Sequence, residues 1–342
     1  MTMDPTILIT IEPYDDTIAA IRSEYPAAEI RNGPFVTSTE EVLSKELIDG
    51  ADILFCDFPP ANFDDFDCLK WIQLTSHGYA QIFGLPTLER GIRVSNGLGT
   101  FDIPIAEWNI MMMLYWDRRM PEMLQNQKNC VWDRAARFQS ELRGAVVGFY
   151  GYGGIARETA RLAKAMGLTV WALKASGTIA SRGNNYCVQG TGDPDGVFCD
   201  RMFGPSDQEE FLSGIDYLII TLPLNKRTEG LIGENQLRML KSSAVLINPA
   251  RAPIIEEQAM IRCMHENWIR GASLDVHYAY PLPPEHPLWS MSNVVLTPHI
   301  SGSCESPHFL ERAYDIFVRN LKRFLAGEPL LNELTPEQLK GG

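Results

Sequence analysis

The sequence lacks the features by which proteins usually bind nucleic acids or membranes. Its 30 Lys and Arg residues stand against 43 Asp and Glu residues, a formal net charge of -13, so no excess positive charge is present to neutralise phosphates or anionic lipid. The most lipid-like stretch, residues 103–116, contains Glu107 and Asn109 and is shorter than the roughly 20 residues that cross a bilayer. We therefore expect neither a nucleic-acid nor a membrane partner.

Cysteine and histidine are scattered along the chain. The seven cysteines include no CxxC pair, and the six histidines include no HxxxH or HExxH pair, so the sequence predicts no metal site. An odd number of cysteines in a chain of 342 residues indicates reduced thiols. Because the start, Met1 to Pro5, carries no positively charged n-region of a signal peptide, we expect a cytoplasmic protein.

Short β-prone runs alternate with helical patterns such as 40–48 and 256–266. Apolar periodicity and turn residues predict strands at 7–11, 52–56, 71–74, 92–95, 145–150, 168–173, 215–221, 244–248, 272–276 and 294–297. From 145 onward the runs are almost continuously apolar, as expected of parallel strands buried on both faces. The pattern predicts an α/β fold of two Rossmann-like, doubly wound domains.

The C-terminal helical pattern, 306–326, comes after the last expected strand. It can therefore pack back on the N-terminal strands and make the first domain discontinuous. The boundaries then expected are 1–104 plus 305–342 for the first domain and 105–304 for the second, with 105–115 as the crossing helix.

A glycine-rich turn follows the strand 145–150 and precedes an amphipathic helix. In residues 151–156 (GYGGIA), Gly151 would make the tight turn, Gly153 would let the backbone approach a pyrophosphate, and Ala156 would let helix and strand touch. The helix N-terminus would then face the phosphates. This context, rather than the glycines alone, predicts a dinucleotide site.

The end of the next strand bears on the choice of cofactor. A carboxylate there usually binds the adenine ribose of NAD, but this chain has Lys174 and Ser176 instead. Lys174 would attract a 2'-phosphate, aided by Ser176 or Arg182, so we expect NADP, with NAD as the alternative. The segment Gly177 to Gly204 is longer than α/β connections usually are and is expected beside the adenosine end of the cofactor.

Polar residues end three later strands, where open α/β sheets bind ligands: 248–251 (NPAR), 275–283 (DVHYAYPLP) and 297–302 (TPHISG). Together with GYGGIA, the turn at 76–78 (SHG) and 105–107 (IAE), their order and spacing resemble the D-isomer-specific 2-hydroxyacid dehydrogenases. The resemblance extends over roughly residues 52–326 and is to the glyoxylate or hydroxypyruvate reductase type.

The resemblance implies hydride transfer from NAD(P)H to a 2-keto acid, giving a D-2-hydroxy acid. Arg251 would bind the substrate carboxylate, and His299 would donate the proton or accept it in the reverse direction. It also implies a flavodoxin-like, substrate-binding first domain, a dinucleotide-binding second domain and a homodimer through the helix after Ile105. The substrate contacts implied are Ser76, His77 and Gly78, and the further cofactor contacts are Tyr152, Gly154, Ile155, Thr221, Leu222, Pro223, Pro249, Ala250, Asp275 (near the nicotinamide carboxamide) and Gly302.

The chain departs from the family at Tyr280, where the resemblance predicts the catalytic Glu that pairs with the histidine. Tyrosine offers a hydrogen bond but no charge at neutral pH, so a Tyr280 that faces His299 would leave the histidine with a lower pKa. Glu285, the nearest acid in sequence, is an alternative partner. His77 replaces a residue that is commonly small in the family, and it would either contact a bulky or acidic substrate or face solvent.

The missing Glu leaves two other functions open. One is a dinucleotide-sensing or scaffold protein with weakened catalysis, although Arg251 and His299 are both retained. The other is a formate-dehydrogenase-like oxidation without proton transfer. Relatives of that kind carry an asparagine where this chain has Phe101, which argues against it.

Overall fold

The computed structural model describes residues 4–340, so Met1–Met3, the first residues of the start discussed above, lie outside the described part. The chain divides into two compact units. The first contains Met1–Phe101, Gly183–Val188 and Cys304–Gly342, and the second contains Asp102–Arg182 and Gln189–Ser303. The chain therefore passes from one unit to the other mainly at 101/102 and 303/304. The domain boundaries expected from the sequence are 104/105 and 304/305. The sequence did not indicate that 183–188 belongs to the first unit.

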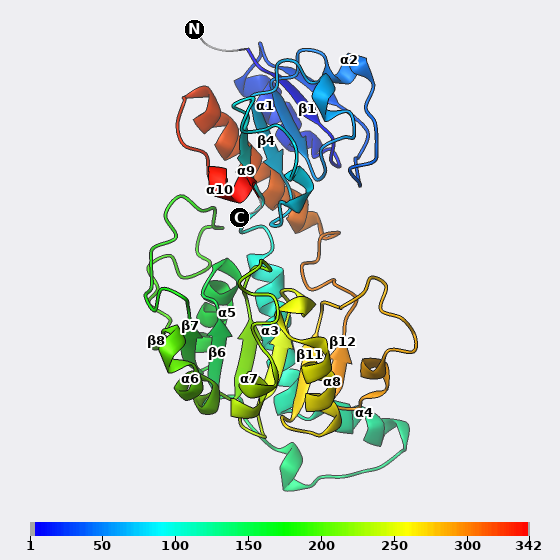
Figure 1. Ribbon diagram of the computed structural model, residues 1–342, viewed down its shortest axis with the longest axis vertical. Helices are drawn as coiled ribbons and strands as arrows, with labels where there is room; N and C mark the ends of the chain where they lie inside the picture. Colours follow the sequence, from blue (N-terminus) through cyan, green and yellow to red (C-terminus); the bar gives the residue numbers. More distant parts are fainter. Residues whose placement is uncertain (1–3, 341–342) are drawn as a thin grey trace. The chain divides into compact units, whose positions relative to one another are not determined.

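The first unit is built on a parallel sheet in the flavodoxin-like order β2-β1-β3-β4-β5 (Figure 1). Its strands are β1 (Thr6–Ile9), β2 (Glu29–Asn32), β3 (Ile53–Cys56), β4 (Trp71–Leu74) and β5 (Arg93–Ser95). The helices α1 (Asp15–Glu24) and α9 (Pro307–Leu325) pack on one face of the sheet, and Phe317 of α9 stacks on Phe55 with ring centroids 4.4 Å apart. Two short helices complete the unit: α2 (Lys45–Ile48) and α10 (Pro336–Leu339).

The second unit is built on a parallel sheet in the order β12-β11-β10-β9-β6-β7-β8. Its strands are β6 (Val146–Tyr150), β7 (Thr169–Leu173), β8 (Arg201–Phe203), β9 (Tyr217–Ile220), β10 (Val245–Asn248), β11 (Gly271–Leu274) and β12 (Val294–Leu296). The strand order reverses between β6 and β9, where doubly wound sheets bind ligands at their carboxyl ends.

Helices cover both faces of the second sheet (Figure 1). On one face lie α3 (Asp102–Asp117) and α5 (Gly154–Ala165), and on the other lie α6 (Gln208–Gly214), α7 (Glu234–Met239) and α8 (Glu257–His265). The helix α4 (Met120–Lys128) has no buried residue. Burial on both sides explains why these strands have continuous apolar sequences.

The fold class and the expected strands are confirmed, with three differences at the polar margins. The helix expected over 40–48 is wrong before Lys45, where α2 begins. The strands β2 and β8 were missed: both are edge strands, and β2 is the polar sequence EIRN, which is not buried at any position. Edge strands can be polar because one side of the strand remains unpaired and in contact with water.

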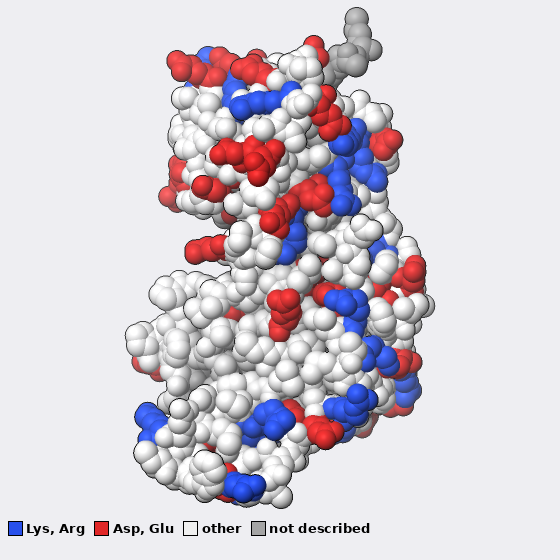
Figure 2. All heavy atoms as spheres, turned by 180° about the vertical axis from the view of Figure 1, so that it is seen from behind, with Lys and Arg blue, Asp and Glu red and all other residues white. Residues whose placement is uncertain are grey.

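Charged side chains of both signs lie on the surface. On the face shown in Figure 2, Lys and Arg side chains are interspersed with Asp and Glu side chains. Among residues 4–340, no helix has the length and apolar character needed to span a bilayer.

Candidate active site

The glycine-rich turn lies at the point where the strand order of the second sheet reverses. Gly151 has φ 97°, a conformation that side chains disfavour, and a Cβ there would lie 3.0 Å from the Thr221 carbonyl oxygen and from Leu222 Cδ2. The Thr221 hydroxyl donates to the Gly151 carbonyl at 2.9 Å. Three predicted cofactor residues, Gly151, Thr221 and Leu222, are thus brought together, with Pro223 following directly in the chain.

Space for a phosphate exists at the start of α5. Gly153 is the N-cap, with an extended backbone, and a Cβ built on it would meet no atom within 4 Å. The helix behind it has 12 residues, so its N-terminal amides can attract an anion. These residues therefore fit the pyrophosphate of a dinucleotide.

Gly154 serves a role that the sequence did not assign to it. A Cβ there would lie 2.1 Å from Asp102 Oδ2 at the start of α3, so only glycine fits. Arg182 donates to the same Asp102 oxygen at 2.9 Å, and both side chains are buried. Arg182, considered above as an aid to a 2'-phosphate, is therefore engaged with Asp102, whereas Lys174 is half-buried beyond β7 and Ser176 is exposed.

The turn after β10 carries Arg251. Asn248 is buried; its Nδ2 donates to the Arg251 carbonyl at 3.1 Å, and its Oδ1 accepts from the Ala250 amide at 3.0 Å. This amide side chain shapes the turn through Pro249 and Ala250, a role that the sequence analysis missed. The Arg251 side chain is exposed, with Nη1 2.7 Å from the Ala250 carbonyl oxygen.

Asp275 organises the loop that carries His299. Its carboxylate is fully buried and accepts four hydrogen bonds, from the Thr297 hydroxyl at 2.6 Å, the Ile300 amide at 3.0 Å, and the Ser301 amide and hydroxyl at 3.0 and 2.5 Å. These donors flank His299 on both sides, and Gly302 follows them directly. The resemblance placed Asp275 beside the nicotinamide; the described hydrogen bonds to its carboxylate all come from this loop.

His299 lies in this loop with φ 57°, in the left-handed region. Partial burial of the ring and then the positive charge of Arg251 lower its pKa, and the negative charge of Asp275 raises it by less. Because Arg251 acts on this pKa, the guanidinium and the imidazole lie within electrostatic range of each other. Glu285, the alternative acid, is not among the charged groups that act on His299 within the described residues.

Tyr280 faces His299 with its ring. The two ring centroids are 5.5 Å apart at an interplanar angle of 52°, and the Tyr280 side chain is largely exposed. The Tyr280 hydroxyl oxygen accepts from the His277 amide at 3.3 Å. The buried His277 ring in turn has Nε2 2.8 Å from the Thr297 carbonyl oxygen. The position of the missing Glu is therefore filled by an uncharged ring.

The predicted substrate turn belongs to the first unit, after β4. The Ser76 hydroxyl donates to the Gly78 carbonyl at 2.8 Å, and Asn96 Nδ2 donates to the His77 carbonyl at 2.7 Å. These bonds define the shape of the turn, and the His77 side chain is exposed. In the same unit, Phe101 stacks on Phe309 with ring centroids 5.1 Å apart, so an aromatic contact occupies the position of the asparagine of formate-dehydrogenase-like relatives.

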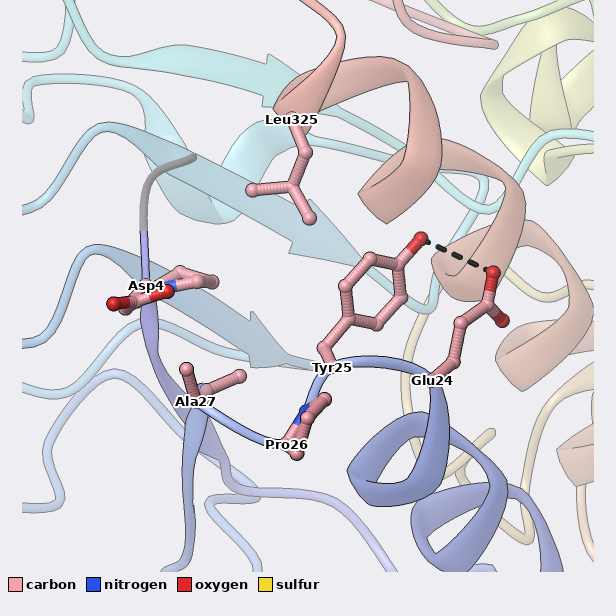
Figure 3. A pocket seen from close by; sticks show the side chains of 8 residues that line it. Asp4, Glu24, Tyr25, Pro26, Ala27 and Leu325 are labelled. Carbon is pink, nitrogen blue, oxygen red and sulfur yellow. Dashed lines mark hydrogen bonds between the residues drawn. The ribbon is translucent and has the colours of Figure 1, made fainter. Parts of the chain in front are cut away.

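Two further observations concern other kinds of site. Figure 3 shows a pocket of about 260 Å³ in the first unit, where Tyr25 donates to Glu24 at 3.4 Å, and none of the predicted site residues lines it. Within residues 4–340, no group of three or more His, Cys, Asp or Glu side chains is arranged to hold a metal ion.

Enzymes that interconvert a carbonyl and a hydroxyl group by hydride transfer with a dinucleotide need a phosphate site and a proton-transferring group. The second unit carries residues for both at the carboxyl ends of one parallel sheet. Its fold and site are those of the dinucleotide-dependent oxidoreductases.

Comparisons with known proteins narrow this class. Residues 110–301 match the family described as "D-isomer specific 2-hydroxyacid dehydrogenase, NAD binding domain". A glyoxylate reductase from Thermofilum pendens is 31% identical over 264 residues, which span 76% of this chain and 73% of that protein. The chain belongs to the D-isomer-specific 2-hydroxyacid dehydrogenase family. It is an NAD(P)-dependent enzyme that interconverts a 2-keto acid and its D-2-hydroxy acid.

Solved structures share the fold over nearly the whole chain. A D-isomer specific 2-hydroxyacid dehydrogenase family protein from Aeromonas salmonicida has a TM-score of 0.78 at 23% identity, covering 97% of this chain and 99% of that one. An NADPH-dependent glyoxylate/hydroxypyruvate reductase from Sinorhizobium meliloti, solved with NADP and sulfate, has a TM-score of 0.74 at 22% identity, covering 99% and 100%.

Proposed function

We propose that this enzyme reduces a small 2-keto acid of the glyoxylate or hydroxypyruvate type with NADPH, and that Arg251 and His299 carry the reaction. The observation that supports the proposal is that Arg251 and His299 follow the carboxyl ends of β10 and β12, two strands of one parallel sheet, and that the charge of Arg251 lowers the His299 pKa. A carboxylate and the carbonyl beside it need a cation and a proton donor close to each other.

Arg251 binds the substrate carboxylate, for which its planar guanidinium is suited. His299 donates a proton to the carbonyl oxygen during reduction and accepts it from the hydroxyl during oxidation. A bound nicotinamide supplies or takes up the hydride. Backbone groups of Ser76, His77 and Gly78 contribute to binding the carboxylate, and Tyr280 contacts the imidazole through its ring.

NADPH is proposed over NADH because of the residues that follow β7. Lys174 supplies a positive charge where a ribose-binding carboxylate would otherwise repel a 2'-phosphate. The phosphate-binding part of the site consists of the turn 151–155, with Thr221, Leu222 and Pro223 beside it. Pro249, Ala250, Asp275 and Gly302 line or shape the nicotinamide end.

The test is NADPH oxidation, followed by absorbance, against a panel of 2-keto acids. The wild-type enzyme should turn over glyoxylate or hydroxypyruvate and yield the D-isomer where the product is chiral, and Arg251→Met should lose most of this activity while it still binds NADPH. NADPH binding without turnover on any keto acid would contradict the proposal. That result would instead support a dinucleotide sensor, the function that the uncharged Tyr280 favours.

We also propose a cytoplasmic homodimer that associates through α3. Ile110, Met111 and Leu114 form an apolar groove of about 470 Å³ with residues of α5, and Met111 is 50% exposed. Exposed apolar surface of this kind suits a symmetric contact with a second copy. Sedimentation should give a dimer that Met111→Glu dissociates, and a monomeric wild-type protein would contradict this.

A further inference from the structure

The segment Gly177 to Gly204 follows β7 and includes β8, and its part 189–204 is bonded to the rest of the second unit at the glycine-rich turn. Three of the residues that make the connection are Tyr152 of the turn, Arg157 of α5 and Asp193 of the segment. Their exposed fractions are 4%, 3% and 0%. Nothing in the proposed reaction uses Arg157 or Asp193.

Asp193 connects a turn of the segment with the glycine-rich turn. Its Oδ1 accepts from the Val197 amide at 2.7 Å, and its Oδ2 accepts from the Phe198 amide at 3.1 Å. The Tyr152 hydroxyl donates to the same Oδ2 at 2.7 Å. Burial and this carboxylate raise the pKa of the Tyr152 phenol far above its ordinary value, so the hydroxyl remains protonated and continues to donate.

Arg157 donates hydrogen bonds to backbone carbonyls of both the segment and the glycine-rich turn. Its guanidinium donates to the Asp193 carbonyl and, at 3.3 and 2.5 Å, to the Pro194 and Ala180 carbonyls. Its Nε donates to the Tyr152 carbonyl at 3.4 Å, and the guanidinium lies 5.2 Å from the Tyr152 ring centroid. Tyr152 is therefore bonded at its carbonyl and at its hydroxyl, between Gly151 and Gly153, whose conformations the phosphate site requires.

We propose that the part of this segment around Asp193 is a working part of the dinucleotide site, and that Asp193 and Arg157 are positioning residues that keep the Tyr152 turn in its phosphate-binding conformation. The proposal rests on the proposed dinucleotide-dependent function. A turn that populates its binding conformation for only a fraction of the time binds ligand more weakly by that fraction. Because the turn meets the phosphates that both cofactors share, the segment controls affinity for NADPH and NADH alike.

The experiment compares two substitutions that each remove one buried hydroxyl, Tyr152→Phe and Tyr150→Phe. Tyr150 lies two residues earlier, at the end of β6; it is also 4% exposed, and its hydroxyl bonds Gln208 rather than the segment. Dissociation constants for NADPH and NADH are measured by fluorescence titration, together with kcat at saturating NADPH and the melting temperature of each variant.

Tyr152→Phe should raise both dissociation constants by about tenfold, the loss expected for one hydrogen bond to a carboxylate. Tyr150→Phe should change neither constant by more than about twofold. Asp193→Asn, which preserves shape but removes the charge, should repeat the Tyr152→Phe result and provides the test if that variant does not fold.

Three results would overturn the inference: unchanged affinity in folded Tyr152→Phe and Asp193→Asn, an equal loss in Tyr150→Phe, or a loss confined to NADPH. The last would place the effect at the 2'-phosphate. A wild-type protein that binds neither dinucleotide would instead defeat the proposed function, so the two failures are distinguishable.

Discussion

Two buried aspartates of the second unit, Asp193 and Asp275, shape different parts of one site. Asp275 accepts four hydrogen bonds from the loop that carries His299, and Asp193 accepts three, one of them from the glycine-rich turn. Both carboxylates are fully buried, where a charge is stable only when it is well bonded. In the proposed function, the region around Asp275 serves proton transfer and the region around Asp193 serves phosphate binding.

The two regions differ in where the hydrogen-bond donors of the aspartate lie relative to the functional residues that it positions. The donors to Asp275 flank His299 directly, so this carboxylate also acts on the imidazole pKa. Of the three donors to Asp193, only the Tyr152 hydroxyl belongs to the glycine-rich turn, and that turn bears no proposed acid–base group. We expect changes around Asp275 to affect turnover and its pH dependence, and changes around Asp193 to affect cofactor affinity.

Of these substitutions, His299→Asn should have the largest effect. It should lower kcat and leave cofactor affinity unaffected. Loss of a general acid–base costs about 10²- to 10⁴-fold in kcat, while NADPH affinity should stay within about twofold of wild type because the phosphate turn is untouched. Steady-state kinetics and a binding titration measure both quantities. His308→Asn, an exposed histidine on α9 paired with Glu311, is the matched control and should behave as wild type.

Lys174→Asp should affect only the phosphate side. A carboxylate after β7 repels a 2'-phosphate and suits the free ribose hydroxyls of NADH, so the preference for NADPH over NADH in kcat/KM should fall by tenfold or more, about 1.4 kcal/mol. The KM for the keto acid should not change. A preference that is the same in both proteins would show that Lys174 does not meet the cofactor.

Tyr280→Glu should have the smallest effect and should reveal itself in the pH profile. The His299 pKa is lowered by partial burial and by Arg251, so the imidazolium needed for reduction is lost as pH rises through that lowered value. A carboxylate beside the ring favours the imidazolium and raises the pKa, so reduction should persist to higher pH. An unchanged alkaline limb would mean that the side chain at 280 does not act on His299.

More of the proton-transfer region than of the phosphate region could be predicted from the sequence. Arg251, Asp275 and His299 each follow an apolar run that became a strand, and strands of one parallel sheet end at a common edge. The hydrogen bonds of Asp275 could not be predicted, because its four donors depend on the folded loop. The glycine-rich turn was recognised by its own pattern, whereas the packing role of Gly154 was not, because the need for glycine there arises from Asp102 on another helix.

The contacts of the segment 177–204 could not be predicted from the sequence, for a physical reason. Its contacts join residues far apart in sequence, such as Tyr152 and Asp193, which are 41 positions apart, and no periodicity reports such pairs. Its middle part, 183–188, belongs to the first unit, where the buried Tyr186 donates to Asp315 at 2.8 Å. Glycine-rich composition indicates turns but does not reveal the partners of the residues between them.

The most direct test of the division between the two aspartates is to measure kcat at saturating NADPH and the NADPH dissociation constant in Asp275→Asn and Asp193→Asn side by side. The account predicts that kcat falls in the first variant while its affinity stays near wild type, and that affinity falls in the second while its kcat is retained. The same pattern of change in both variants would contradict it.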